Sequence, residues 1–230
     1  MKDRGLKVYA WVCERTGIDK IWTALMLRPI PEAKGWVEHL YTLGSATMMI
    51  FTVQAVTGFL LATNYVPSPD HAYDSVRYID STVLFGRVVR GLHHWGASFM
   101  VVFAVLHMLR VYFMGSYKYP REATWIAGVG LLLLVLGFSF TGYLLPWDQK
   151  AYWATVVGTT IAGTTPFVGS WVANILRGSD GMGAPTLTRF YALHVLALPA
   201  LTAGLIGVHL FLVIWHGISE PPERASKKAP

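Results

Sequence analysis

The sequence predicts an all-α membrane protein built on a bundle of four transmembrane helices. Of the 230 residues, 53% are hydrophobic and only 14% are charged, which is too apolar for a soluble domain of this length. Long segments without a charged residue recur along the chain, and four of them can supply the roughly 20 apolar residues that cross the core of a bilayer. The formal net charge of +6 is therefore assigned to a membrane surface, and no nucleic-acid binding is expected.

The four spans are expected at residues 37–65, 85–114, 123–145 and 187–217. A fifth uncharged segment, residues 151–176, is rich in Thr and Gly, and Pro166 lies near its middle. Because proline removes a backbone donor and interrupts a helix, this segment is predicted to form short interfacial helices between spans three and four.

The two ends of the chain are predicted to lie outside the bundle. Residues 1–36 are expected to form an N-terminal interfacial segment, with a proline-containing turn at residues 28–31 and no cleavable signal peptide. One face of its helix would carry Val8, Trp11, Val12 and Arg15. Residues 37–217 then form the four-helix domain, and residues 218–230 form a basic C-terminal tail.

Basic residues favour placing both chain ends on the inner side of the membrane. With four spans, thirteen of the 19 Lys and Arg residues fall on the side that holds the termini, and six fall on the other side. Short cytoplasmic loops of membrane proteins collect Lys and Arg. The side with the termini is therefore predicted to be the inner one.

Several histidines lie inside the predicted spans, where an ionisable side chain is costly and indicates function. His93 and His107 are 14 residues apart on the second span, which brings them within about 40° of one helix face. His194 and His209 are 15 residues apart on the fourth span, about 60° from alignment, which modest tilt or curvature can accommodate. The rise within each pair is about 21–22.5 Å, so each helix offers one imidazole near each membrane edge.

Spans two and four run in the same direction, so His93 is level with His194 near the outer edge, and His107 is level with His209 near the inner edge. Each level can hold one six-coordinate heme between two imidazoles. His94 is excluded because it is 13 positions from His107, a separation that turns its side chain about 140° away from that partner's face. A lone histidine in a span is often only a hydrogen-bonded polar residue, but four at matched depths favour ligation.

Glycines on the other two spans repeat the same spacing. Gly44 and Gly58 are 14 residues apart on the first span, and Gly128 and Gly142 are 14 apart on the third. A flat macrocycle between helices requires backbone without side chains. These glycines are therefore predicted to give clearance for two hemes, although close helix packing would favour the same residue type.

Two arginines flank the predicted ligands. Arg90 lies three residues before His93, and Arg110 lies three residues after His107. A guanidinium at these positions could pair with a heme propionate. Each side chain could equally extend to the membrane interface, and spacing alone leaves both interpretations open.

Several longer motifs accompany these residues. They are Arg90-Gly-Leu-His-His-Trp-Gly-Ala, Leu106-His-Met-Leu-Arg110, Tyr119-Pro-Arg-Glu122, Thr141-Gly-Tyr-Leu-Leu-Pro-Trp-Asp-Gln-Lys-Ala-Tyr-Trp153, Thr186-Leu-Thr-Arg-Phe-Tyr191 and the closing Gly217-Ile-Ser. With them the chain closely resembles, over nearly its whole length, cytochrome b6 and its split, b6-type bacterial relatives in the cytochrome bc family. The spacing on the fourth span is also typical of the split type, whereas the longer, unsplit cytochromes b have one residue fewer.

The resemblance implies two non-covalent b-type hemes. His93 and His194 would hold the low-potential heme at the outer side, and His107 and His209 would hold the high-potential heme at the inner side. The chain would be the cytochrome b subunit of a quinol:cytochrome c (or similar acceptor) oxidoreductase. A quinol at the outer site would give one electron to a Rieske protein and the other, through the hemes, to an inner quinone, which couples electron transfer to proton translocation.

The resemblance also implies partners and a location. The partners would be a three-helix protein like subunit IV, a Rieske iron–sulfur protein and a c-type cytochrome, in a complex that forms a homodimer. The membrane would be a bacterial cytoplasmic membrane or a thylakoid membrane.

The acidic Pro-Glu-Trp-Tyr type motif of the outer quinol site is not in this chain. In split systems that motif belongs to the three-helix subunit, so this chain would form only part of the site.

Three residues are candidates for the quinone sites. Tyr143 and Trp147 are candidates for the outer site, although Tyr143 could simply pack at the interface. His216 lies seven residues after His209 and within about 20° of the same face, where it could hydrogen-bond or protonate an inner quinone. A solvated histidine near a helix C-terminus would fit the same position.

Two departures from the family pattern concern a third heme. Classical cytochrome b6 anchors an extra heme through a cysteine near the inner end of the first span, and this chain has Thr42 there. The basic residues that precede Gly-Ile-Ser in that family are replaced by Ile214 and Trp215. A covalent third heme is therefore predicted to be absent.

Two other functions compete with the redox subunit. A passive di-heme electron conduit for a partner dehydrogenase would have no bifurcating site, and the motif at residues 141–153 argues against it. A transporter that moves protons through intramembrane histidines would show no b-type heme absorption. The redox subunit is the favoured function, and a neighbouring gene for a Rieske protein or a three-helix subunit would decide between it and the conduit.

Overall fold

The computed structural model describes residues 2–26, 35 and 37–220, and within these ranges all regular secondary structure is helical. Four helices in the described part are long and apolar enough to cross a membrane, as predicted. They are α4 (Leu43–Ala62), α6 (Gly86–Phe113), α7 (Glu122–Leu144) and a continuous helix over Ala184–His216. The last consists of α10 (Ala184–Ala192), a π-helical turn η1 (Leu193–Ala197) and α11 (Leu198–His216).

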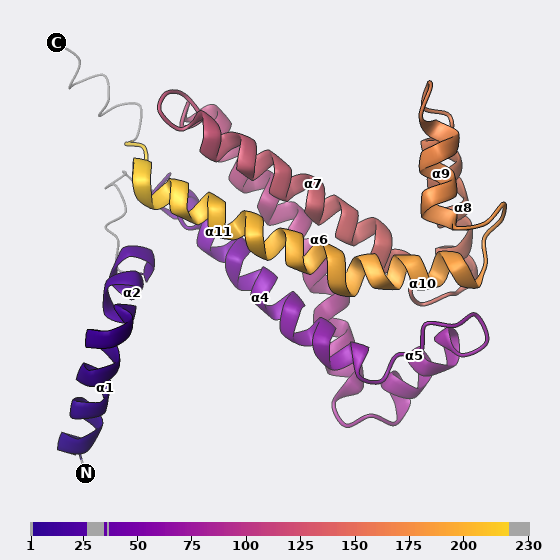
Figure 1. The fold of residues 1–230 in the computed structure, drawn as a ribbon, viewed down its shortest axis with the longest axis horizontal. Coiled ribbons are helices and arrows are strands. Elements are labelled where there is room, and N and C mark those ends of the chain that lie inside the picture. The colour runs from indigo at the N-terminus through magenta and orange to yellow at the C-terminus, as the bar shows by residue number, and fades with distance from the viewer. Residues whose placement is uncertain (1, 27–34, 36, 221–230) are drawn as a thin grey trace.

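The four long helices pack into one bundle, with α4 along α6, α7 along α11 and α6 against α7. Figure 1 shows them lying along a common axis, while α5 (Ala72–Ser81) and the pair α8 (Gln149–Gly163) and α9 (Gly169–Arg177) project from the end where α10 begins. We call this end the outer level, with His93 and His194, and the other end the inner level, with His107 and His209. The names follow the predicted orientation.

The surface of the bundle is apolar. Only 6–11% of the residues in the most hydrophobic window of each span are buried within the chain. Side chains such as Phe59 and Leu133 are therefore exposed. Apolar side chains on this surface favour lipid over water. The backbone can also lie in lipid, because a helix satisfies its own hydrogen bonds.

The outer connections contain short helices, as predicted for the segment around Pro166. Asp148 begins α8 by accepting a hydrogen bond from the Ala151 amide at 2.8 Å, and Gly178 ends α9 in the left-handed conformation with φ of 74°. A small buried cluster joins α5 to the outer ends of spans three and four, and it consists of Ala72, Leu144, Leu187 and Phe190.

The first span is shorter than predicted. A separate turn, α3 (Val37–Leu40), precedes α4, because the Tyr41 and Thr42 amides bond to carbonyls three residues back rather than four. At the other end the helix stops at Ala62 rather than near residue 65.

The N-terminal segment forms two helices where one was predicted. They are α1 (Lys2–Thr16) and α2 (Ile18–Met26), separated by Gly17, whose φ is 61°. Their location at a membrane interface stays a prediction. The turn predicted at residues 28–31 and most of the predicted basic tail, residues 221–230, lie outside the described residues.

Candidate functional site

The four histidines meet in pairs across the bundle. At the outer level, the ring centroids of His93 and His194 are 6.3 Å apart with an interplanar angle of 76°. At the inner level, His107 and His209 are close enough to interact electrostatically. His94 belongs to neither pair, since its side chain is exposed and packs edge-on against Trp95.

The chemistry of these pairs fits an axially ligated macrocycle. A metal–imidazole bond is about 2.0–2.1 Å long in zinc sites, so a 6.3 Å centroid separation admits one metal ion between two ring nitrogens. Among the described residues, no three His, Cys, Asp or Glu side chains converge as metal ligands. Two imidazoles leave the other positions of a transition metal to a ligand from outside the protein, and the nitrogens of a porphyrin supply them in a heme.

Each histidine ring lies against one of the four predicted glycines. A Cβ atom built on each glycine would meet the Cε1 atom of the facing ring at the following distances: Gly142 and His194, 2.6 Å; Gly58 and His93, 3.1 Å; Gly44 and His107, 3.2 Å; Gly128 and His209, 3.3 Å. Real Cβ atoms essentially never approach closer than 3.0 Å, which only the Gly142 position would do, and the other three distances are tighter than nine in ten real Cβ contacts. The glycines thus provide direct clearance for the imidazole rings, a contact that the spacing argument did not anticipate.

The 15-residue separation on the fourth span is accommodated by a π turn, not by the tilt or curvature that was predicted. His194 lies within η1, where the Leu198 amide bonds to the Leu193 carbonyl five residues back. A π turn holds one residue more than an α turn. The extra residue is therefore absorbed locally, and His194 and His209 can face the same side of the helix.

Two threonines that the sequence reasoning missed contact the outer histidines. The Thr57 Oγ1 atom lies 3.0 Å from His93 Nδ1, and the Thr141 Oγ1 atom lies 3.1 Å from His194 Nδ1. A signal was present in the sequence, because each threonine immediately precedes a spaced glycine. The equivalent positions before Gly44 and Gly128 hold no hydroxyl group.

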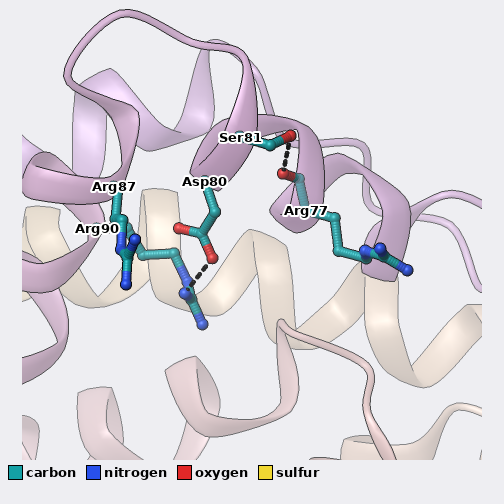
Figure 2. Close-up of a pocket in the computed structure, with 5 residues that line it drawn as sticks. All are labelled: Arg77, Asp80, Ser81, Arg87 and Arg90. Carbon is teal, nitrogen blue, oxygen red and sulfur yellow. Dashed lines mark hydrogen bonds and ion pairs between the residues drawn. The ribbon is translucent and has the colours of Figure 1, made fainter.

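The two flanking arginines differ in their partners. Arg90 forms an ion pair with Asp80, which comes from α5. Figure 2 shows this pair beside Arg77 and Arg87 around a surface depression of about 420 Å³. Arg110 instead stacks on the Tyr41 ring, 3.7 Å from its centroid.

Arg110 also has unused hydrogen-bonding capacity. Its buried Nε and Nη2 atoms have no hydrogen-bond partner among the described residues. A buried cationic group without an acceptor is costly, and a carboxylate such as a heme propionate would satisfy both atoms.

The candidate quinone residues lie at opposite ends of the molecule. Trp147 has a strained backbone, with φ of 52°, and lines a depression of about 450 Å³ together with Tyr73 and residues 148–150. Tyr143 is half exposed and is not part of that lining. At the inner end, the half-buried His216 ring places Nδ1 3.2 Å from the Leu212 carbonyl.

Tyrosine contacts join the outer ends of the first, third and fourth spans. The Tyr65 hydroxyl donates a hydrogen bond to the Leu145 carbonyl at 2.6 Å, and its ring stacks on Tyr191. Burial raises the pKa of the Tyr65 phenol above its ordinary value, with a smaller contribution from Tyr191. Tyr65 therefore stays a neutral donor that holds the end of span three.

Comparison with known proteins agrees with this arrangement. The family model described as cytochrome b/b6/petB matches residues 30–217. The menaquinol:cytochrome c reductase cytochrome b subunit of Bacillus subtilis is 45% identical over 220 residues, covering 94% of this chain and 98% of the relative. Cytochrome b6 of Heliobacterium mobile is 44% identical over 212 residues, covering 92% of this chain and 99% of the relative.

The fold has a counterpart among solved structures. A chain of a hyperthermophilic respiratory complex III matches with a TM-score of 0.82 and 31% sequence identity, covering 96% of this chain. This chain spans 59% of that longer one. Together with the paired histidines and their glycines, these matches show that the chain belongs to the cytochrome b/b6 family.

Proposed function

We propose that the chain is the di-heme cytochrome b subunit of a quinol:cytochrome c oxidoreductase. The observation that carries the proposal is the pairing of four intramembrane histidines at two levels, each ring seated on a glycine. The relative from Bacillus subtilis, named as a menaquinol:cytochrome c reductase subunit, is matched over 98% of its length, which supports the same role for this chain.

His93 and His194 would hold the outer heme, and His107 and His209 would hold the inner one. When bound, the two b-type hemes supply one-electron carriers at the two levels. The residues of this chain place each imidazole against a glycine and leave the buried Nε and Nη2 atoms of Arg110 for a propionate.

The proposed reaction separates the two electrons of a quinol. At the outer side, a quinol would lose two electrons and two protons, giving one electron to a Rieske protein and one to the path across this chain. A quinone at the inner side would take up electrons and protons. The depression at Trp147 would form this chain's part of the outer pocket, and a three-helix partner subunit would supply the rest.

His216 is suited to proton exchange at the inner side. Its Nδ1–H group can donate to the Leu212 carbonyl, which leaves Nε2 free to face a quinone. Arg121 fixes the same helix end by donating to the His216 and Gly217 carbonyls at 3.3 and 3.0 Å. Inner quinone reduction should slow in His216→Ala, whereas unchanged kinetics would rule out this role.

A covalent third heme is proposed to be absent. Thr42 is exposed, and its hydroxyl group donates to the His39 carbonyl at 2.7 Å, so the position offers no thiol for attachment. Pyridine hemochrome analysis should find only extractable heme on this chain. Heme that survives a denaturing gel on the subunit would contradict the proposal.

The complete assembly is proposed to contain a Rieske protein, a c-type cytochrome and a three-helix subunit, and to be a homodimer. It would lie in a bacterial cytoplasmic or thylakoid membrane, with both termini of this chain on the inner side.

A potentiometric titration of the purified complex tests the central proposal, the di-heme subunit. It should resolve two b-type hemes with separate potentials in this chain, and an absorption spectrum without b-type bands would overturn it.

A further inference from the structure

We infer that Thr57 and Thr141 are positioning residues that lower the reduction potential of the outer heme by accepting hydrogen bonds from its two histidine ligands. The inference rests on the proposed function, because it requires a heme at each level. It concerns residues that do not touch the iron and act only through His93 and His194.

The hydrogen-bond directions follow from the threonine hydroxyl groups. Thr57 donates its single hydroxyl proton to the Val53 carbonyl at 2.6 Å, and Thr141 donates to the Gly137 carbonyl at 2.8 Å. With that proton committed, each Oγ1 atom can only accept from the neighbouring histidine Nδ1–H group. The contacts of 3.0 and 3.1 Å lie within the ordinary range for such bonds.

This arrangement sets the tautomer of both outer histidines. A proton held on Nδ1 leaves the lone pair on Nε2, which is the nitrogen that can bind iron. Thr57 and Thr141 are only 6% and 5% exposed, so water does not compete for these hydrogen bonds.

The inner level lacks equivalent acceptors. The residues before Gly44 and Gly128 are Leu43 and Ala127, which carry no hydroxyl group. The Nδ1 atoms of His107 and His209 have no hydrogen bond of standard geometry among the described residues. Backbone carbonyl groups contact histidines at both levels: Gln54 contacts His93, Phe138 contacts His194 and Thr124 contacts His209. The two levels therefore differ in the threonine hydroxyl groups rather than in backbone contacts.

The direction of the effect follows from ligand basicity. A strong acceptor on Nδ1–H increases electron donation from Nε2, which stabilises the oxidised iron more than the reduced iron. Two additional hydroxyl acceptors at the outer level, with no hydroxyl at the equivalent inner positions, would separate the two potentials in the direction expected for electron flow inward.

Valine substitutions test the outer threonines, because valine keeps the shape and removes the acceptor. In the purified complex, we expect the equilibrium constant for reduction of the outer heme to rise about threefold in Thr57→Val or Thr141→Val and about tenfold in the double variant. A tenfold change corresponds to about 59 mV for a one-electron couple. The inner heme should not shift, and Thr57→Ser and Thr141→Ser should behave as wild type.

A second pair of variants adds the hydroxyl group at the inner level instead of removing it at the outer level. This pair tests the inference even if the valine variants lose the outer heme. Ala127→Thr places a hydroxyl group before Gly128, and Ala127→Val is the matched control. The equilibrium constant for reduction of the inner heme should fall about threefold in Ala127→Thr relative to Ala127→Val.

Two results would overturn the inference while leaving the proposed function intact. One is an unshifted outer potential in a double valine variant that retains both hemes. The other is equal inner potentials in Ala127→Thr and Ala127→Val. A wild-type complex without two b-type hemes would instead refute the proposed function.

Discussion

The outer and inner histidine pairs share the same placement of helices and glycines but differ in the polar groups around them. Both place an imidazole from α6 opposite one from the last span, and both seat each ring on a glycine of α4 or α7. At the outer level the histidine Nδ1 atoms meet threonine hydroxyls, and the nearby Arg90 is paired with Asp80. At the inner level the Nδ1 atoms have no such partner, and Arg110 has no acidic partner in the described part of the chain.

This difference shows that the histidine pairing and the groups around each pair vary independently in this fold. A buried positive charge near a heme favours the reduced state, whereas acceptors on the ligands favour the oxidised state. Both features would make the inner heme easier to reduce than the outer one. The two levels can therefore be altered independently by substitution.

Removal of a single imidazole should have the largest effect, because it breaks one level and spares the other. His194→Ala should eliminate the outer heme, and His209→Ala should eliminate the inner heme, each halving the b-type absorbance of the chain. His94→Ala is the matched control and should keep both hemes. Loss of both hemes from a well-folded His209→Ala complex would show that the two levels are not independent.

Filling the glycine clearance should disturb the outer level more than the inner one. A Cβ atom would approach His194 to 2.6 Å in Gly142→Ala but would approach His209 only to 3.3 Å in Gly128→Ala. Overpacking typically costs about 1–3 kcal/mol. We expect most of the outer heme to be lost from Gly142→Ala, with near-normal inner heme in Gly128→Ala, as measured by hemochrome quantification. The reverse order would contradict the geometry.

Replacing each of the two arginines with glutamine should affect the two levels differently, with smaller effects than the histidine and glycine substitutions. Arg110→Gln removes a buried donor that no protein carboxylate engages, and a hydrogen bond to a charged group is worth about 1.5–3 kcal/mol. We expect weaker retention and a lower potential for the inner heme. Arg90→Gln should affect the outer heme less, because Asp80 already engages Arg90 and the side chain is partly exposed. Potentiometry and heme retention in detergent would measure both variants, and equal effects would count against the comparison.

Deletion of Leu196 should have the smallest effect on heme binding. This residue lies in η1 and is 68% exposed, so its removal can convert the π turn into an α turn without moving α11. Both hemes should be retained. Deletion of Leu201, which lies outside η1, is the control and should impair binding at the outer level. Equal heme loss in both deletions would show that the π turn does not absorb the extra residue.

The sequence by itself determined the four spans, the two histidine pairs and the four glycines. The spans follow from the length of the apolar segments. The histidines and glycines follow from the regular geometry of one helix, in which the spacing of two residues fixes both a face and a height. Candidates such as Trp147 and His216 came from the family resemblance and from position, and their roles stay predictions.

Only the tertiary structure decided which group faces which across the bundle. The contacts of Thr57 with His93, Asp80 with Arg90 and Tyr41 with Arg110 each join residues of different helices. Such contacts depend on how neighbouring helices are rotated and spaced, which spacing along one helix does not specify. The π turn at His194 has the same origin, because an extra residue can be absorbed as curvature or as a local turn, and packing against α7 and α4 selects between them.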